Sequence, residues 1–267
     1  KRTKGAVERY IYLRYAERQR TIAKIISILE AAKSETFKIS EMFDLFVADP
    51  GIRRSIDKAY EIVTYSLFET VVTGLGTVIK VSVPSTSSEL LDEFADLAEI
   101  LLGLGKGRLQ REEPAHIYRV GVTNAADRGL DMWANFGPAI QVKHVTLDSN
   151  LANEIVDQVE SDLIVLVCRD ADAETIQTIS KQISWGRRVR GMVNESKLVE
   201  WYERCMRGKF SERLAGPLLR RLLDGFKSEF PQIQDDGISR FLKERGYLAQ
   251  KRYDPWLTDI DLQSGKV

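Results

Sequence analysis

Three polar side chains near the middle of the chain have the types and spacing that phosphodiester hydrolysis needs: Asp131, Gln141 and Lys143. A hard divalent cation such as Mg²⁺ binds a few oxygen ligands and keeps several waters. Asp131 offers an anionic oxygen and Gln141 a neutral carbonyl oxygen. Lys143 can stabilise the charge that develops on the phosphorane, or orient or deprotonate the attacking water. The alternative is that Asp131 and Lys143 only form an ion pair between two exposed strands.

A β-hairpin must position these groups. The sequence predicts strands at 130–134 and 139–147, joined by a short glycine-containing turn at 135–137. In such a hairpin Asp131 lies opposite Gln141. Because side chains alternate between the two faces, Asp131, Gln141 and Lys143 emerge on one face and Val142 on the other. A register shift of one residue would separate them.

Strands and helices alternate around this hairpin. Further strands are predicted at 77–83, 117–122, 162–168 and 189–193, and helices at 6–32, 39–47, 55–72, 88–101, 150–159, 173–183 and 196–206, with more helix beyond 210. This order predicts an α/β fold with a central mixed sheet flanked by helices. We expect a helical N-terminal region over 1–54, a core over 55–210 and a basic helical C-terminal region over 211–267.

The charges are balanced overall but unevenly distributed. The 267 residues include 39 Lys and Arg and 39 Asp and Glu, and a neutral protein lacks the basic footprint of most nucleic-acid-binding proteins. Along the chain, however, residues 1–20 carry a net +5, residues 204–252 a net +6 and the remainder −11. Net neutrality therefore does not exclude DNA as a partner, because attraction to phosphate is local and screened by salt.

Other classes of protein are excluded more directly. The 2 cysteines, Cys168 and Cys205, are too few for a disulfide framework or a four-cysteine zinc site, which fits a reducing cytoplasm. No uncharged run approaches the roughly 20 apolar residues of a membrane-spanning helix. The sequence starts without Met or an apolar signal-peptide core, so we expect that a longer sequence precedes it.

A longer stretch of sequence around the hairpin matches a known pattern. The spacing of Asp131, Gln141 and Lys143 resembles the PD-(D/E)XK nuclease motif in the variant with Gln at its middle acidic position. The stretch from Gly121 to His144 resembles the HaeII-type family of type II restriction endonucleases, and the similarity extends from Ser55 to about Tyr202. The resemblance implies a restriction-endonuclease-like core. It also implies Mg²⁺-dependent, sequence-specific cleavage of double-stranded DNA that leaves 5′-phosphate and 3′-hydroxyl ends, with Mn²⁺ as a substitute.

The resemblance also assigns residues to roles. Asp131 and Gln141 become metal ligands and Lys143 the motif lysine. Because Gln is neutral, another carboxylate has to compensate, and related nucleases often carry a Glu on the helix before the first core strand. Glu69 is our choice because it lies closer to the strand predicted at 77–83, and Glu61 is the alternative. Either is otherwise a solvated surface glutamate.

Contacts with DNA and with other proteins are less defined. Arg187, Arg188 and Arg190 can contact phosphate or guanine edges, or simply line a loop before a strand. The tyrosines and arginines of the first 18 residues can bind a DNA backbone or form a dimer face. We expect a cytoplasmic bacterial homodimer, since symmetric sites mirror two-fold protein symmetry, with a DNA methyltransferase as genetic partner. The alternatives are a repair or mobile-element nuclease and a non-catalytic DNA-binding or interaction protein.

Overall fold

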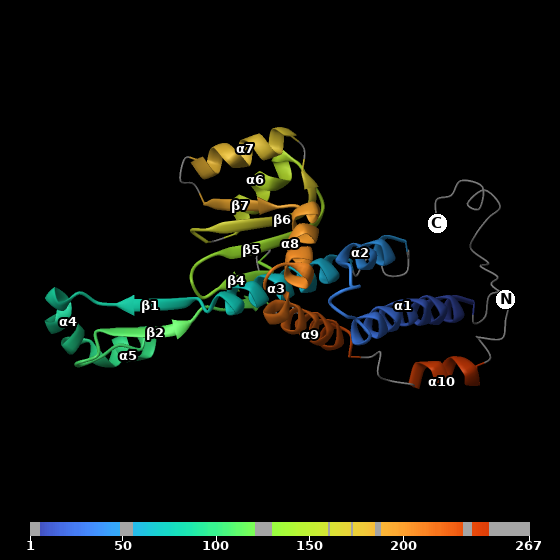
Figure 1. Ribbon diagram of the computed structural model, residues 1–267, viewed down its shortest axis with the longest axis horizontal. Coiled ribbons are helices and arrows are strands. Elements are labelled where there is room, and N and C mark those ends of the chain that lie inside the picture. The colour runs from blue at the N-terminus through green and yellow to red at the C-terminus, as the bar shows by residue number, and fades with distance from the viewer. Residues whose placement is uncertain are drawn as a thin grey trace.

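A mixed sheet lies at the centre of the computed structural model, which describes residues 6–48, 56–120, 130–159, 161–171, 173–184, 188–231 and 237–245 (Figure 1). It has five strands in the order β3-β4-β5-β6-β7. Antiparallel pairing joins β3 to β4 and β4 to β5, and parallel pairing joins β5 to β6 and β6 to β7. The strands are β3 (Ile117–Arg119), β4 (Met132–Ala134), β5 (Ala139–Leu147), β6 (Ile164–Ala171) and β7 (Val189–Val193). The predicted α/β class is confirmed.

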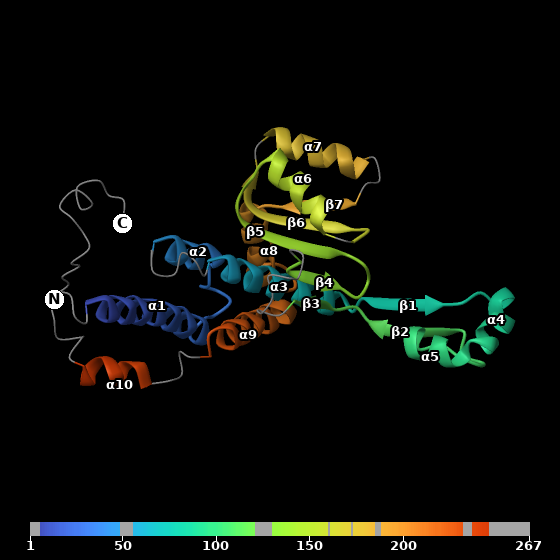
Figure 2. The same cartoon turned by 180° about the vertical axis from the view of Figure 1, so that it is seen from behind.

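Helices cover both faces of this sheet. On one face, side chains of α3 (Ile56–Leu75), α8 (Glu195–Arg207) and α9 (Ser211–Glu229) share a core with Val142 and Val167. On the other face, α6 (Ser149–Gln158) and α7 (Ala173–Ser184) pack on alternate residues of the same strands (Figure 2). Burial on both faces accounts for the nearly unbroken apolar run of β6.

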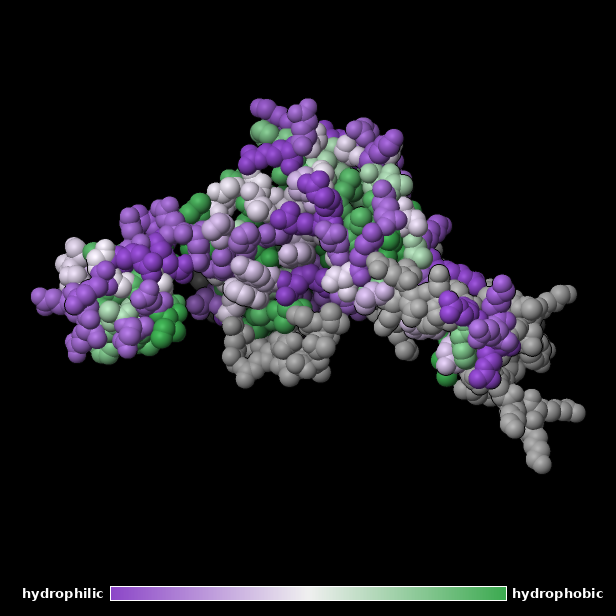
Figure 3. Space-filling view, turned by 90° about the horizontal axis from the view of Figure 1, so that it is seen from below, coloured by the Kyte–Doolittle hydropathy of each residue, from purple (hydrophilic) through white to green (hydrophobic). Residues whose placement is uncertain are grey.

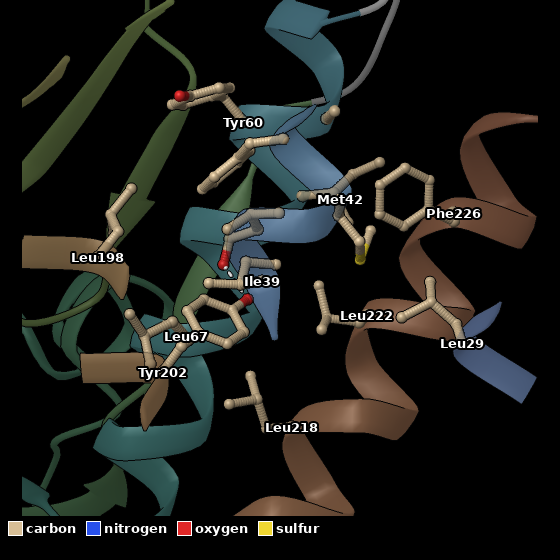
Figure 4. Close-up of a cluster of buried hydrophobic side chains, with 14 of the residues drawn as sticks. Leu29, Ile39, Met42, Tyr60, Leu67, Leu198, Tyr202, Leu218, Leu222 and Phe226 are labelled. Atoms are coloured by element: carbon tan, nitrogen blue, oxygen red, sulfur yellow. Dashed lines mark hydrogen bonds between the residues drawn. The ribbon is translucent and has the colours of Figure 1, made fainter. Parts of the chain in front are cut away.

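The larger core continues into the helical regions at both ends of the chain. Apolar residues of α1 (Ala6–Glu30) and α2 (Ile39–Ala48) pack with those of α3 and α9, as Leu29, Met42, Leu67 and Phe226 show in Figure 4. The Tyr202 hydroxyl donates a 2.8 Å hydrogen bond to the buried Val63 carbonyl, which ties α8 to α3. The three segments expected from the sequence therefore share one apolar core across residues 54 and 210.

The hairpin has the predicted register. Met132 pairs with Ile140 and Trp133 with Ala139. The Gly137 amide donates to the Ala134 carbonyl at 2.9 Å, and Gly137 has φ of 119°, a conformation that favours glycine. β4 is shorter than predicted, so Asp131 lies immediately before it rather than inside it.

A projecting arm replaces the predicted first core strand. The strand at 77–83 forms, as β1 (Val78–Ser82), but it pairs only with β2 (Gln110–Pro114) in a separate two-stranded ribbon. Placing it in the core is therefore wrong, and the first strand of the main sheet is β3. No strand was predicted at β2 because three of its five residues are charged. The helix predicted at 88–101 divides at Phe94 into α4 (Ser88–Glu93) and α5 (Ala95–Leu102) at the end of the arm (Figure 1).

A last helix, α10 (Gly237–Glu244), lies beside α1, where the rings of Phe241 and Tyr12 are 4.7 Å apart. Among the helices in the described ranges, none combines the length and the apolar character needed to cross a membrane.

Candidate active site

Asp131 and Gln141 meet where β4 begins. The Gln141 Nε2 and the Val142 backbone amide both donate to Asp131 Oδ2, each at 2.7 Å. The structure therefore brings together the acid and the amide that the hairpin register predicts. Asp131 accepts both bonds through one oxygen, and neither bond uses its Oδ1.

Charged groups surround the Asp131 carboxylate. Its pKa is raised from 3.8 to about 6, chiefly by burial and also by the negative charge of Glu61. The hydrogen bond from Val142 and the positive charges of Lys143 and Lys58 act in the opposite direction. A cation bound beside Asp131 would act in the same direction as these lysines. It would lower the pKa of Asp131 and so offset the free-energy cost of keeping a partly buried carboxylate ionised.

Gln141 leaves one atom without a partner. Its side chain is only 2% exposed, and its Oε1 is buried with no hydrogen-bond partner. An unsatisfied buried carbonyl oxygen costs free energy unless something binds it. Since Nε2 of the same amide points to Asp131, Oε1 is available as a neutral oxygen ligand for a cation. The residues present therefore fit the magnesium ion that the motif implies.

Glu61 is one of the charged groups that act on Asp131. It lies on α3 and is 5% exposed, and Lys58 Nζ donates to both of its carboxylate oxygens at 2.8 Å. Arg119 Nη2 lies 3.5 Å from Glu61 Oε2 and 2.9 Å from Glu229 Oε2. The sequence carried no signal for Arg119 or Glu229, because their partners are remote in the chain. The i,i+3 spacing of Lys58 and Glu61 on a helix could have been read as a pair.

Glu69 has different surroundings. Its Oε2 accepts a 2.7 Å hydrogen bond from the Ile117 amide, and its Oε1 lies 2.9 Å from His116 Nδ1. Arg221 of α9 lies 3.7 Å from the same Oε1. This buried carboxylate joins α3 to the start of β3 and to α9. Its contacts hold elements of the fold together, whereas Glu61 and its partner Lys58 both act on the charge of Asp131.

The remaining predicted residues are dispersed. Lys143 is half-buried on β5, two residues beyond Gln141. Arg188 Nε donates to the Ser161 carbonyl at 2.6 Å, Arg190 is exposed on the edge strand β7, and Arg187 lies outside the described residues. Cys168 and Cys205 are buried free thiols.

An aromatic pair beside the site was not anticipated. Tyr118 on β3 and Trp133 on β4 are cross-strand neighbours whose rings stack at 4.6 Å, and they remain 41% and 45% exposed. Trp133 is two residues from Asp131, so the two side chains belong to the same face by alternation. The alternation of the strand sequences could have revealed this pair.

Within the described part of the chain, no three Asp, Glu, His or Cys side chains gather into a metal-binding group. Asp131 and the Gln141 carbonyl offer two oxygen ligands here, and the negative charge of Glu61 also acts on Asp131. Mg²⁺ sites in proteins commonly use one or two carboxylates and complete their shell with waters and substrate phosphate oxygens.

Comparison with known proteins gives a consistent result. The model of the HaeII restriction endonuclease family matches residues 1–247. The chain is 38% identical over 247 residues to the type II restriction enzyme HaeII of Haemophilus aegyptius, covering 92% of this chain and 70% of that protein. It is 40% identical over 244 residues to the type II restriction enzyme NgoBI of Neisseria gonorrhoeae, covering 91% and 69%. No solved structure matches the chain.

Proposed function

Because the chain belongs to the HaeII restriction endonuclease family, we propose that it is a type II restriction endonuclease that hydrolyses both strands of DNA at a short specific sequence. The observation that carries this proposal is the hairpin that joins Asp131 to Gln141 and leaves a buried carbonyl oxygen unpaired. Family membership supports the class of reaction, and this geometry supports the place where it occurs.

We propose that Asp131, the Gln141 Oε1 and Glu61 hold Mg²⁺, with Mn²⁺ as a substitute. This replaces Glu69 by the alternative, Glu61, because the negative charge of Glu61 acts on the Asp131 carboxylate. The carboxylate oxygens of both glutamates have protein partners, so their hydrogen bonds do not decide between them. The ion would neutralise charge on the scissile phosphate and lower the pKa of an attacking water.

The protein's own groups orient this site. The Gln141 and Val142 donors both bind Oδ2 and so fix the rotation of the Asp131 carboxylate. Neither of these bonds uses Oδ1, which we propose as the oxygen that binds the ion. Lys58 holds both oxygens of Glu61. Lys143 supplies a positive charge near Asp131 that can stabilise the phosphorane or orient the water. Attack on phosphorus with loss of the 3′ oxygen gives the expected 5′-phosphate and 3′-hydroxyl ends.

A restriction enzyme of this kind implies an oligomeric state, a compartment and a partner enzyme. Cleavage of both strands at a symmetric site calls for a homodimer. A bacterial cytoplasm and a methyltransferase that protects the host's own sites follow from a restriction system. The stacked Tyr118 and Trp133 and the exposed Arg190 are candidate contacts with the DNA.

The test is cleavage of several unmethylated plasmid and phage DNAs with Mg²⁺ or Mn²⁺. Wild type should give discrete fragments. Lys143→Ala and Asp131→Ala should lower the cleavage rate by at least about 100-fold, as loss of a charge-stabilising group commonly does. Lys181→Ala on the exposed surface of α7 is the matched control and should cut normally. A smear would indicate a repair or mobile-element nuclease, and DNA that is bound but left intact would contradict the enzyme.

A further inference from the structure

Lys58 binds the same carboxylate that the proposed function assigns to the metal ion. Its Nζ donates to both Oε1 and Oε2 of Glu61, each at 2.8 Å, and the two residues lie three positions apart on α3. Figure 3 shows hydrophilic side chains over much of one face of the molecule, and such groups are normally solvated. The Lys58 side chain, in contrast, is 33% exposed and that of Glu61 only 7%. Water and salt therefore screen this pair less than a pair on the open surface.

An ammonium group that bonds to both oxygens of a carboxylate lies where a cation would lie. Mg²⁺ binds its oxygen ligands at about 2.0–2.1 Å, so an ion on either oxygen of Glu61 would come within about 5 Å of Lys58 Nζ. Two cations that close repel each other strongly in a partly buried place. Arg119 Nη2, which lies 3.5 Å from Glu61 Oε2, adds to this repulsion. The ion and the Lys58 ammonium therefore compete for Glu61.

Lys58 also acts on the other carboxylate of the site. Burial raises the pKa of Asp131, and the positive charges of Lys143 and Lys58 oppose that effect. A bound cation would oppose it in the same way. The protein without metal thus already has a counter-ion that serves both Glu61 and Asp131.

The other oxygens of the site differ from those of Glu61 in this respect. Gln141 Oε1 is buried without a hydrogen-bond partner, and the bonds from Gln141 and Val142 to Asp131 use only its Oδ2. An ion could therefore bind the Gln141 oxygen without displacing a protein group. Binding to Glu61 has the additional cost of breaking its bonds with Lys58.

We propose that Lys58 is the resident counter-ion of Glu61, that it leaves this carboxylate when Mg²⁺ binds, and that it thereby lowers the affinity of the protein for the ion. The inference rests on the proposed function, because it takes Glu61 as a ligand, and it adds a positioning residue to that site. One cation replaces another in this step. The ammonium keeps its proton and moves toward the solvent, which its side chain already reaches.

Binding of Mn²⁺ to the whole chain tests the proposal without a cleavage step. Electron paramagnetic resonance measures free Mn²⁺, at pH 8, where Asp131 with its pKa of about 6 is ionised. Lys58→Met removes the charge and keeps a long side chain, and it should tighten Mn²⁺ binding by about tenfold or more. Lys58→Arg keeps the charge and should bind Mn²⁺ no more tightly than the wild type. A merely structural lysine predicts the opposite, since a damaged site binds the ion more weakly.

Lys197 provides a matched control. It is the third residue of α8, as Lys58 is of α3, and its Nζ donates at 2.8 Å to Glu200, three positions further on. Lys197→Met should leave Mn²⁺ binding unchanged. Glu61→Gln added to Lys58→Met should remove the gain in affinity, because the carboxylate for which the two cations compete is then absent.

Acetylation of lysines with acetic anhydride, measured by peptide mass spectrometry, follows the displacement itself. Saturating Mg²⁺ should speed the modification of Lys58 and leave that of Lys197 unchanged, since only Lys58 loses its hydrogen bonds. The proposal is overturned if Lys58→Met binds Mn²⁺ no more tightly than the wild type, or if Mg²⁺ leaves the acetylation of Lys58 unchanged. Cleavage assays on the same preparations report the proposed function separately: a protein that exchanges Lys58 for the ion and leaves DNA intact would contradict the nuclease alone.

Discussion

Gln141 changes the electrostatics of the candidate site relative to the acidic residue usual at its position. A carboxylate there would repel Asp131, whereas the Gln141 amide donates a hydrogen bond to it and keeps its own carbonyl oxygen free. The hydrogen bond therefore orients the Asp131 and Gln141 side chains with one negative charge fewer than a pair of carboxylates would have. The remaining unfavourable feature is the partly buried charge of Asp131.

The raised pKa of Asp131 predicts how the metal-free protein depends on pH. Its folded pKa of about 6 exceeds the ordinary 3.8, so the folded state binds the proton more tightly, and this contribution to stability is full below about pH 4 and lost as the pH rises through 6. In EDTA, Asp131→Asn should therefore stabilise the protein by about 1–3 kcal/mol at pH 8 and hardly at all at pH 4. Urea unfolding at both pH values measures the difference, and an equal gain at both would contradict the explanation.

Glu61 and Glu69 should behave differently when each is made neutral. Glu61→Gln should raise the Mg²⁺ concentration needed for half-maximal cleavage by about tenfold or more, because the site loses an anionic ligand. Glu69→Gln should leave that concentration unchanged and lower stability by about 1–3 kcal/mol, since its carboxylate serves Ile117 and His116. Magnesium titrations of cleavage decide between them, and the reverse pattern would restore Glu69 as the ligand.

The strand pairing of the hairpin that carries the site could be predicted from the sequence, and the strand pairing of the arm could not. Alternation and the Asn-Phe-Gly turn determine the hairpin register from local sequence, and the register is confirmed by the pairing of Met132 with Ile140. The strand at 78–82 also has a local signal, but its partner does not. β2 is rich in charge because neither face of the ribbon packs on the main core, so hydrophobic periodicity is absent there.

Local sequence also could not distinguish Glu61 from Glu69 as the second carboxylate of the site. Both glutamates lie on α3, and local sequence shows them only as neighbours on one helix. Which of their charges acts on Asp131 depends on how α3 crosses the sheet. The arm lies between α3 and β3, so the strand at 78–82 that favoured Glu69 is not the first strand of the main sheet.

Arg119 should be a critical link between α3, β3 and α9. It is 18% exposed and lies against both Glu61 and Glu229. Arg119→Ala should cost about 3–5 kcal/mol, since it leaves the buried Glu229 carboxylate without this cation and Glu61 with Lys58 alone. Arg108→Ala, which breaks the exposed pair with Glu99, should cost no more than about 1 kcal/mol and is the matched control. Denaturant unfolding compares them, and similar losses would show that the Arg119 cluster is not stabilising.

For the whole molecule, the basic C-terminal segment is partly neutralised by the protein itself. Four of its basic side chains lie against acidic ones: Arg204 with Glu200, Arg207 with Glu203, Arg221 with Glu69 and Lys227 with Glu30. The excess charge counted along the sequence is therefore an upper bound on what DNA would meet. Several of these groups hold helices together instead.

The shared core predicts that the helical ends and the sheet unfold together. Phe226 is fully buried between α9 and α2, where its ring stacks on Phe46 at 5.9 Å. Phe226→Ala should cost about 3–5 kcal/mol and keep one cooperative transition by both tryptophan fluorescence and circular dichroism. Phe210→Ala, at a side chain that is 61% exposed, should have little effect. Two separate transitions would show that the N- and C-terminal helices form independent units.

The arm also determines how this fold can be altered by engineering or by evolution. Its two strands leave the body side by side, with Val78 paired to Pro114 and the Ala115 amide donating to the Thr77 carbonyl at 2.9 Å. A connection between two adjacent backbone positions needs only a short turn. The whole segment from β1 to β2 could thus be removed, and α3 could pass almost directly into β3 without disturbing the hairpin of β4 and β5 that positions Asp131 and Lys143.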